Sequence, residues 1–564
     1  DIRARVLASP PRHYSANRMR VAMLGRESLD ELEELATRYF RAVPNRNAPP
    51  PPLVADPFPL RRTGRHTVVK PVEDTDELAM YWTIPSEWDQ YEAAPSWYLA
   101  HVFGHEGAGS LLQLLKSRGL ADGVSAGVEV SARGFAMFYL DITLLPGTGA
   151  DAGVVRNVTA AVYAYANMLR DPHAAVGGNT GVQQRVWVEA RDLAEISFRY
   201  PERGSPSGTA SGLASRLQRV QPALILSPPS ALRWNPDGIA AALDYITPER
   251  QGSFVLASTV NVSSLPDTDP LYGTRSITHF LDAATKAALA ASAEPTDLIH
   301  LPAPNRYIPT DFSLAAGATP LYNGTDQPGR GQAAKPLALA DAPGADAVSG
   351  AWWLQDTLFK MPKTEVRALL TSAVADGTAR QHVLTSLFVD FVDDTLTEVA
   401  YDAGLAGLYF SLAPSSVTSG FSLTLGGWSH RLPEWIDAVV AGIKAPTFSA
   451  RRFEDLRAAL LQAYTNAESG VKPYERAMYW ASALSAERKY LLEELRAEAL
   501  AVTLADVQAH AAAVLSPLDV SILVHGNADE ATAKALVLRV AAGFDAAPLE
   551  AADQARRQIV RLPP

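Results

Sequence analysis

Two stretches of the chain end in the same glycine corner: SLLQLLKSRGLA (residues 110–121) and LTEVAYDAGLA (residues 396–406). In each, leucine or valine recurs at helical spacing until a glycine, Gly119 or Gly404, is reached. Glycine commonly ends a helix because it adopts the left-handed conformation without strain. The sequence therefore predicts, twice, a helix that stops at a tight corner.

The residues after each corner repeat as well. The expected strands are residues 124–130 and 136–144 in the first copy, and residues 408–412 and 422–425 in the second. A further glycine stands before the second strand of each copy, 15 residues beyond the first glycine in one copy and 16 in the other. Solenoid repeats recur every ~20 to 50 residues. The two copies are much further apart along the chain than that, which indicates duplicated whole domains. We therefore expect the function to depend on the space that these domains enclose.

A closing unit of one strand and one helix also recurs. Residues 19–24 are expected to form a strand, and Ser28 with Glu31 has the pattern of a capping box at the start of a helix. The same order returns as a strand at residues 519–526 and a helix at residues 528–542. One strand and one helix cannot bury both faces, so we expect the first of these units to need partners upstream of residue 1.

These repeats predict an α+β fold of tandem homologous domains, each a mainly antiparallel sheet packed against helices, in two halves joined by a long linker. The expected divisions are the end of domain one (residues 1–55), a complete second domain (65–265), a helix and inter-half linker (266–345), a complete third domain (346–548) and the start of a fourth (549–564). The linker prediction rests on residues 303–350, which are poor in charge and rich in Gly, Pro and Ala. Two halves on such a tether can open and close.

Composition excludes several classes of function. The 564 residues carry a formal net charge of −11 and no basic stripe, so nucleic acid is not an expected partner. The absence of cysteine removes disulfides, thiolate metal ligands and thiol nucleophiles. No run of ~18 apolar residues occurs, so no membrane span is expected. Because the sequence begins with Asp1 rather than Met, we expect a processed protein or an internal piece of a longer one.

The densest group of candidate ligands is His101, His105 and Glu106. Two histidines four residues apart face one way on a helix, and a glutamate could complete a metal shell. Glycines crowd this segment, so the helix is expected to break near His105. Three interpretations stay open: a metal site, a substrate contact, or a glycine-rich turn capped by polar side chains. Neither His-Glu-x-x-His nor His-x-x-Glu-His occurs in the sequence.

The strand expected at residues 124–130 carries very small side chains in its Ser-Ala-Gly core, residues 125–127. Another backbone could approach closely there, so a substrate could add as a strand while Glu106 holds its positive amino terminus. The alternative is that the small residues let the following helix pack. The sequence favours neither.

At these residues the chain resembles the insulinase/pitrilysin family of zinc metallopeptidases, in family order along nearly its whole length. The segments that carry the resemblance are 14–19 (YSANRM), 24–30 (LGRESLD), 104–112 (GHEGAGSLL), 132–135 (ARGF), 307–312 (YIPTDF), 403–405 (AGL), 477–479 (AMY) and 524–527 (VHGN). Single segments are weakly specific, and together they are highly specific.

The resemblance implies four homologous metallopeptidase-like α+β domains in two bowl-shaped halves around a closed chamber, which admits unfolded peptides of limited size. It implies a zinc ion held by a His-x-x-Glu-His motif in the first domain, and an assisting Arg and Tyr in the fourth. This chain would then hold the end of domain one, domains two and three, and the hinge linker. Zinc would be a cofactor of the intact enzyme, and no catalytic or metal-binding residue is expected in this chain.

The resemblance carries over one site, an exosite that grips the amino-terminal end of a substrate away from the zinc. The substrate-binding positions that it implies are His101, Gly104, Glu106, Val124, Ser125 and Ala126. Many relatives have glycine where this chain has Ala126, whose methyl group is expected to narrow the approach.

Three hypotheses follow. In the first, the chain is the central part of an insulinase-like zinc metalloendopeptidase, supplies substrate anchoring, chamber wall and hinge, and is inactive alone. The second is a non-catalytic peptide-binding paralogue, and the third is a stand-alone hydrolase with a metal at His101, His105 and Glu106. Expected partners are unfolded or short peptides and the remaining domains of the protease, with a homodimer left open. Analogy within the family suggests the periplasm, with the cytoplasm as the alternative.

Overall fold

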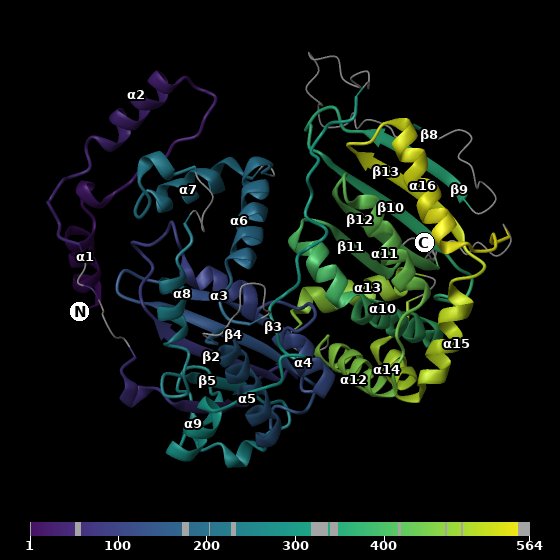
Figure 1. The fold of residues 1–564 in the computed structure, drawn as a ribbon, viewed down its shortest axis with the longest axis horizontal. Coiled ribbons are helices and arrows are strands. Elements are labelled where there is room, and N and C mark those ends of the chain that lie inside the picture. Colours follow the sequence, from purple (N-terminus) through teal and green to yellow (C-terminus); the bar gives the residue numbers. More distant parts are fainter. Residues whose placement is uncertain are drawn as a thin grey trace.

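Two β-sheets organise the chain in the computed structural model, one in the first unit (residues 58–301) and one in the second unit (residues 348–550). The units lie side by side, the first in blue and teal and the second in green and yellow (Figure 1). The structure describes residues 2–50, 53, 58–171, 180–201, 204–226, 233–316, 337–338, 348–415, 419–467, 471–486 and 489–550.

The two sheets repeat one strand order. The first runs β3-β4-β2-β5-β1-β7-β6 and the second β11-β12-β10-β13-β9-β8. Over the five shared positions, the pair β1 and β5 is parallel, as is β9 and β13, and the other pairs are antiparallel. The first sheet has β1 (Arg65–Val69), β2 (Glu77–Ile84), β3 (Ala121–Ser131), β4 (Ala136–Leu144), β5 (Gly252–Leu256), β6 (Asp267–Thr268) and β7 (Arg275–Phe280). The second has β8 (Leu337–Ala338), β9 (Val348–Gln355), β10 (Lys363–Thr371), β11 (Tyr409–Pro414), β12 (Gly420–Trp428) and β13 (Asp519–Gly526). The predicted α+β class with repeated, mainly antiparallel sheets is confirmed, while the domain boundaries stay predictions.

Alternating apolar residues give each sheet one face that packs against helices. In β2, Leu78, Met80, Trp82 and Ile84 are buried, and the residues between them are only partly buried. Successive side chains of a strand point to opposite faces, so this alternation directs the four apolar side chains to the same side. Burial of each stabilises the fold by about 1.5–3 kcal/mol.

The helices of the first unit are α3 (Pro95–Phe103), α4 (Leu111–Arg118), α5 (Ala152–Leu169), α6 (Gln184–Arg199), α7 (Pro206–Arg216), α8 (Pro236–Leu243) and α9 (Ala283–Ala290). All of them except α7, which buries no residue, contribute side chains to the core on the apolar face of the first sheet. Helix α5 begins after Asp151, whose carboxylate accepts from the backbone N–H groups of Gly153 and Val154. Its Tyr163 and Tyr165 are fully buried in the first core.

In the second unit, one long helix stands where the first unit has α3 and α4. The helices are α10 (Ala379–Leu405), α11 (Leu432–Lys444), α12 (Ala450–Asn466), α13 (Pro473–Ser485), α14 (Leu492–Ala501), α15 (Leu504–Val514) and α16 (Glu530–Phe544). Gly119 ends α4 in the left-handed conformation (φ 60°), as predicted. Gly404 remains helical, and the left-handed residue of the second corner is Gly407 (φ 81°), because α10 continues through Leu405. No helix of the described residues is long and apolar enough to cross a membrane.

The N-terminal residues partly contradict the prediction. The described residues 19–24 form no strand, because neither sheet reaches them and their backbone groups lack a partner strand. The segment preceding them holds α1 (Ile2–His13). The predicted capping box is confirmed at the start of α2 (Leu29–Phe40): Ser28 Oγ accepts from Glu31 N at 3.3 Å, and Glu31 Oε2 accepts from Ser28 N at 2.8 Å. None of the α2 residues is buried in the described structure.

The described beginning of the predicted linker, residues 301–316, runs along the second unit. Tyr307 is buried against that unit's core. Asn527 donates to Ser313 O at 2.9 Å and accepts from Ala315 N at 2.7 Å. Residues 317–336 and 339–345 of the predicted linker, 346–347 of the predicted third domain, and 551–564 of the predicted fourth domain lie outside the described residues. The linker is therefore fixed to the second unit where it begins.

Candidate functional site

The predicted exosite begins where α3 ends. Helix α3 stops at Phe103, and Gly104 caps it with its N–H bonded to Ala100 O. His105 and Glu106 occupy the turn that follows, before Ser110 caps the start of α4. The predicted break of the helix near His105 is confirmed.

Gly104 lies against the second part of the predicted site. A Cβ atom added to Gly104 would stand 3.0 Å from Ala100 O and 3.5 Å from the Ala126 Cβ and N atoms. Glycine therefore lets the end of α3 approach β3. Because the Ala126 methyl group points toward this helix end, it lies out of the plane in which an added strand would pair with β3.

Strand β3 carries the other predicted residues at the open edge of the first sheet. Val124 is buried in the core, and Ser125 is exposed on the opposite face of the sheet. At the open edge of the sheet, Val124 therefore presents its backbone rather than its side chain. The register with β4 shifts between Ala121 and Gly123 and again between Val128 and Val130. Residues 123–127 also match the Gly-x-Ser-x-Gly pattern of a nucleophile elbow, but they lie within a strand rather than at a strand-to-helix turn.

His101, in the last turn of α3, and His105, in the turn that follows, are not arranged as metal ligands. His101 stacks on Trp97 with ring centroids 6.4 Å apart, and its ring is nearly perpendicular to that of His105. His105 Nδ1 accepts from Gly107 N at 3.0 Å. Burial lowers the pKa of His101 to about 4 and, with the neighbouring His101, lowers that of His105 to about 3. Both rings are neutral near pH 7, and the described residues include no group of three His, Asp or Glu side chains arranged to hold a metal ion.

Glu106 lines a cavity of about 400 Å³ between the two units. The other residues lining it are Gln113, Lys116, Ser117, Asp394, Thr397, Glu398, Ser449, Arg451 and Arg452. Burial raises the pKa of Glu106, and the nearby Lys116 ammonium opposes that shift. Within the described part of the chain, the Glu106 carboxylate has no hydrogen-bond partner. It is thus a half-buried acceptor next to open space.

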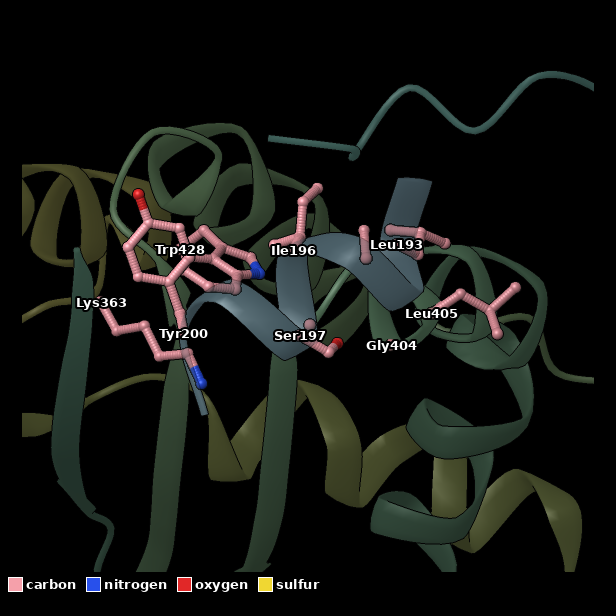
Figure 2. A pocket seen from close by; sticks show the side chains of 10 residues that line it. Leu193, Ile196, Ser197, Tyr200, Lys363, Gly404, Leu405 and Trp428 are labelled. Carbon is pink, nitrogen blue, oxygen red and sulfur yellow. The ribbon is translucent and has the colours of Figure 1, made fainter. Parts of the chain in front are cut away.

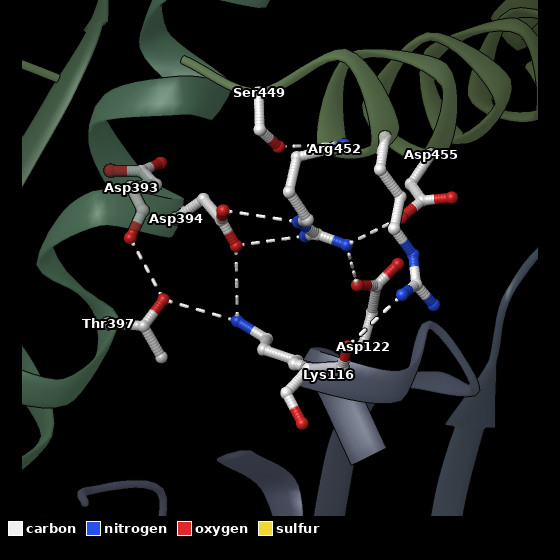
Figure 3. Close-up of polar contacts among 10 residues, drawn as sticks. Lys116, Asp122, Asp393, Asp394, Thr397, Ser449, Arg452 and Asp455 are labelled. Atoms are coloured by element: carbon white, nitrogen blue, oxygen red, sulfur yellow. Dashed lines mark hydrogen bonds and ion pairs between the residues drawn. The ribbon is translucent and has the colours of Figure 1, made fainter. Parts of the chain in front are cut away.

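Most charges around this cavity are already paired across the units (Figure 3). Arg452 of α12 contacts Asp394 and Asp122 at 2.8 Å and Asp455 at 3.2 Å, and Lys116 lies 3.4 Å from Asp394. Burial lowers the pKa of Arg452, but the Asp394 and Asp122 carboxylates outweigh it and raise that pKa overall. This set is called the ionic cluster below.

A second cavity, of about 290 Å³, opens between α6 and the second glycine corner (Figure 2). Its walls include Ile196, Tyr200 and Trp428. Tyr200, Phe312 and Trp428 form three ring contacts with centroids 5.1 to 5.3 Å apart, and Lys363 Nζ lies 5.0 Å from the Trp428 ring. This aromatic cluster joins the first unit, the linker and the second unit.

Sequence reasoning brought His101, Gly104, Glu106 and β3 together, and the structure places them in contact or close by. It missed the second unit's contribution from α10 and α12. Those partners lie 278 and 330 residues from Lys116 and Asp122, and no local pattern reports a pairing over that separation.

Comparison with protein families identifies the class. A family model described as the middle or third domain of peptidase M16 matches residues 198–498, and one described as the peptidase M16 inactive domain matches residues 2–172. The first match alone covers more than half of the chain. The chain belongs to the M16 peptidase family, the insulinase/pitrilysin family, which confirms the resemblance stated above.

Individual relatives agree with this assignment. The chain is 28% identical to human insulin-degrading enzyme over 536 residues, which is 93% of this chain and 49% of that protein. It is 27% identical over 502 residues to the A-factor-processing enzyme of Saccharomyces cerevisiae, covering 88% of this chain and 45% of that protein. The crystal structure of pitrilysin matches with a TM-score of 0.66 at 22% identity, over 97% of this chain and 55% of that chain, which shows the shared fold. The chain spans about half the length of the curated relatives it matches.

Proposed function

We propose that this chain is the central part of an insulinase-like zinc metalloendopeptidase. In this proposal it supplies a site that anchors the amino terminus of a peptide, part of a chamber wall, and the hinge between two halves. The substrates are unfolded or short peptides, and the protein partners are the remaining domains of the same protease. A homodimer and a periplasmic location stay predictions.

The observation that carries the proposal is the Glu106 carboxylate. It is half-buried, lacks a hydrogen-bond partner among the described residues and borders a cavity. A half-buried carboxylate has lost part of its hydration, and a charge-assisted hydrogen bond to an ammonium group would replace what it has lost. The α-amino group of a peptide is such a partner, and the cavity has room for the residue that bears it.

The open edge of β3 supports the same function. An edge strand presents unpaired backbone N–H and C=O groups, and an extended peptide can pair with them. Ser125, Ala126 and Gly127 have little side-chain bulk along this edge. A peptide held by its amino group at Glu106 and by its backbone at β3 would be fixed in orientation, which lowers the entropy cost of presenting a bond to a distant active centre.

The hinge assignment rests on where the linker is attached. Residues 305–312 contact both units: Asn305 N bonds to Glu189 of α6 at 3.2 Å, and Asn305 Nδ2 donates to Asp402 O at 2.6 Å. Phe312 adds a stacked ring to Tyr200. We infer that the units pivot near these contacts and separate at the ionic cluster.

Zinc belongs to the proposal through the family, and the candidate ligands among the described residues do not fit it. His105 uses Nδ1 for Gly107, His101 is stacked on Trp97, and Glu106 faces the cavity. We therefore propose that the metal and the catalytic groups are held by other domains of the parent protease. No chemical step is assigned to this chain.

A binding experiment tests the anchoring function. A fluorescent peptide of about 20 residues is titrated against the chain beside its N-acetylated twin. Loss of a charge-assisted contact predicts about tenfold weaker binding of the acetylated peptide, and the same loss for the free peptide in the Glu106→Gln variant. Glu195→Gln, which changes an exposed carboxylate on α6, is the matched control. Equal affinity for the two peptides would overturn the anchoring function.

A second experiment tests the placement of the chemistry. The chain is incubated with a quenched fluorogenic peptide and zinc, and we expect no cleavage above that seen with bovine serum albumin. Zinc-dependent cleavage that is lost in His105→Ala would instead support a stand-alone hydrolase. Addition of the missing domains is expected to restore cleavage, whereas binding without cleavage by the intact protein would favour the non-catalytic paralogue.

A further inference from the structure

His105 is a buried residue to which the proposed function gives no role. The residue is 3% exposed, and it stands between Gly104 and Glu106 in the turn after α3. On one side, its ring closes this turn through the bond from Gly107 N to Nδ1. On the other side, it is turned toward the second unit.

Two consecutive residues of α10 meet the His105 ring from the second unit. Tyr401 makes an edge-to-face contact with centroids 4.6 Å apart, and Asp402 Oδ1 lies 3.6 Å from His105 Nε2. Because Nδ1 accepts a backbone N–H, the single proton of the neutral ring is on Nε2 and points toward that carboxylate. At 3.6 Å this is a charge–dipole contact rather than an ion pair.

The turn is shaped to admit this contact. A Cβ atom on Gly107 would stand 2.7 Å from His105 Cε1, so a side chain there would displace the His105 ring, whereas its 3.6 Å distance to Asp402 Oδ1 is an ordinary contact. A parallel contact runs from Gly109 N to Gln113 Oε1 (2.7 Å) and from Gln113 Nε2 to Glu398 Oε1 of α10 (2.9 Å). Helix α10 thus touches the segment 105–113 twice, on both sides of Glu106.

We propose that His105 is a positioning residue through which α10 of the second unit holds the turn that carries Gly104 and Glu106 in its peptide-binding shape. Resting on the proposed anchoring function, this inference adds that docking of the two units and binding of a peptide amino terminus are coupled. When the units separate, the turn loses Tyr401 and Asp402, and the carboxylate of Glu106 is no longer held at the cavity. By linkage, a bound peptide amino terminus in turn favours the docked units.

Two replacements of His105 separate its two contacts. In His105→Asn, the amide oxygen can still accept from Gly107 N, but the side chain is too short to reach Tyr401 and Asp402. In His105→Gln, the longer side chain can reach Asp402, but its amide no longer occupies the Nδ1 position. Asp402→Asn removes the charge from the other unit and leaves the hydrogen bond from Asn305 Nδ2 to the Asp402 backbone carbonyl in place.

Affinity for the free and the N-acetylated peptide is measured for each variant of the full 564-residue chain. Coupling energies of contacting residues predict about tenfold weaker binding of the free peptide by His105→Asn and by Asp402→Asn, and no further loss in the double variant. Binding of the acetylated peptide stays as in the unchanged chain. His279→Asn, at an exposed position on β7, is the control and leaves both affinities unchanged.

Three results would overturn the inference. Losses in His105→Asn and Asp402→Asn that simply multiply in the double variant would show independent roles. Full affinity in His105→Asn together with weak binding in His105→Gln would show that only the local turn matters. An equal loss for both peptides would show a general structural defect.

Hydrogen exchange keeps this inference distinct from the anchoring function. If acetylation does not weaken binding to the unchanged chain, anchoring at Glu106 fails, and exchange still decides the role of His105. Faster exchange of the amides of residues 104–109 in Asp402→Asn, whose change lies on the other unit, supports positioning across the interface. Unchanged exchange there overturns it, whatever the peptide result.

Discussion

The two glycine corners occupy equivalent places in the two units but meet the opposite unit through different chemistry. At the first corner, the guanidinium of Arg451 lies against Gly119, and Arg451 Nη1 donates to Ser117 O at 3.1 Å. Beside it stands the ionic cluster. At the second corner, Gly404 and Gly407 face Leu193 and Ile196 of α6 across the smaller cavity.

The helices that meet the corners are equivalent as well, since α6 and α12 each come second after the paired strands of their unit. Duplication therefore produced a nearly symmetric interface with one ionic side and one aromatic side. Water can solvate separated charges, so an ionic contact comes apart at low net cost, whereas exposing aromatic rings costs about 25 cal/mol per Å². This difference supports the proposal that the units pivot at the aromatic side and open at the ionic side.

Removing an aromatic ring from the aromatic side of the interface is expected to lower the free energy of unfolding more than any other change proposed here. Trp428 is 4% exposed, and Trp428→Ala removes two ring contacts and leaves a cavity. We expect the free energy of unfolding to fall by about 3–5 kcal/mol, measured by urea denaturation. Trp480→Ala, at a half-exposed ring of α13, is the control and should change it by less than about 1 kcal/mol. Equal losses of unfolding free energy in the two variants would show that the aromatic side contributes no more to stability than a half-exposed ring elsewhere.

A smaller effect is expected from breaking the ionic side. Arg452→Ala leaves three carboxylates facing one another, and because these groups are partly buried we expect a loss of about 2 kcal/mol. The radius of gyration measured by X-ray scattering should rise as the units separate. Arg457→Ala on the same helix removes a pairing with Glu454 inside one unit and should cost less than about 1 kcal/mol. An unchanged radius in Arg452→Ala would contradict an opening at this side.

Added salt tests the difference between the ionic and the aromatic side without a mutation. Raising NaCl from about 0.1 M to about 1 M shortens the screening length from about 10 Å to about 3 Å. We expect amide exchange in residues 450–455 to accelerate by a few fold, since about 1 kcal/mol of ion-pair energy is screened, while residues 193–200 keep their rates. Equal acceleration of amide exchange in residues 450–455 and 193–200 would show that salt weakens both sides of the interface together.

The smallest effect concerns pH and the cavity at the ionic side. Burial raises the pKa of Glu106, so this carboxyl takes up its proton at a higher pH than an ordinary glutamate. Its charged form, and with it the attraction for a peptide amino group, is complete well above that pKa and is lost as the pH falls through it. Titration of the free peptide should show affinity falling a few fold on acidification from pH 7, and Glu106→Gln should abolish this dependence. A dependence that persists in Glu106→Gln would place the titrating group elsewhere.

Local sequence patterns predicted helices and strands. They missed the features that depend on contacts between residues far apart in the chain. The sequence predicted strands at residues 136–144 and 519–526, which are the observed bounds of β4 and β13, and Ser28 with Glu31 predicted the cap of α2. Residues 19–24 have strand-like composition, yet they form no strand, because a strand needs a neighbour that no described residue offers. Glu106 was found by resemblance and composition. Its neighbours Glu398 and Arg452 come from another unit, and sequence spacing carries no information on such docking.

The two register shifts of β3 limit the length of any segment that could pair with its edge. They leave residues 123–128 as the regular stretch between them. At about 3.3 Å per residue, this stretch offers a footprint of about 20 Å, a span of six residues. Bulges also twist an edge away from flat pairing partners. The edge of β3 is therefore suited to pairing with one short peptide segment and poorly suited to templating an extended intermolecular sheet.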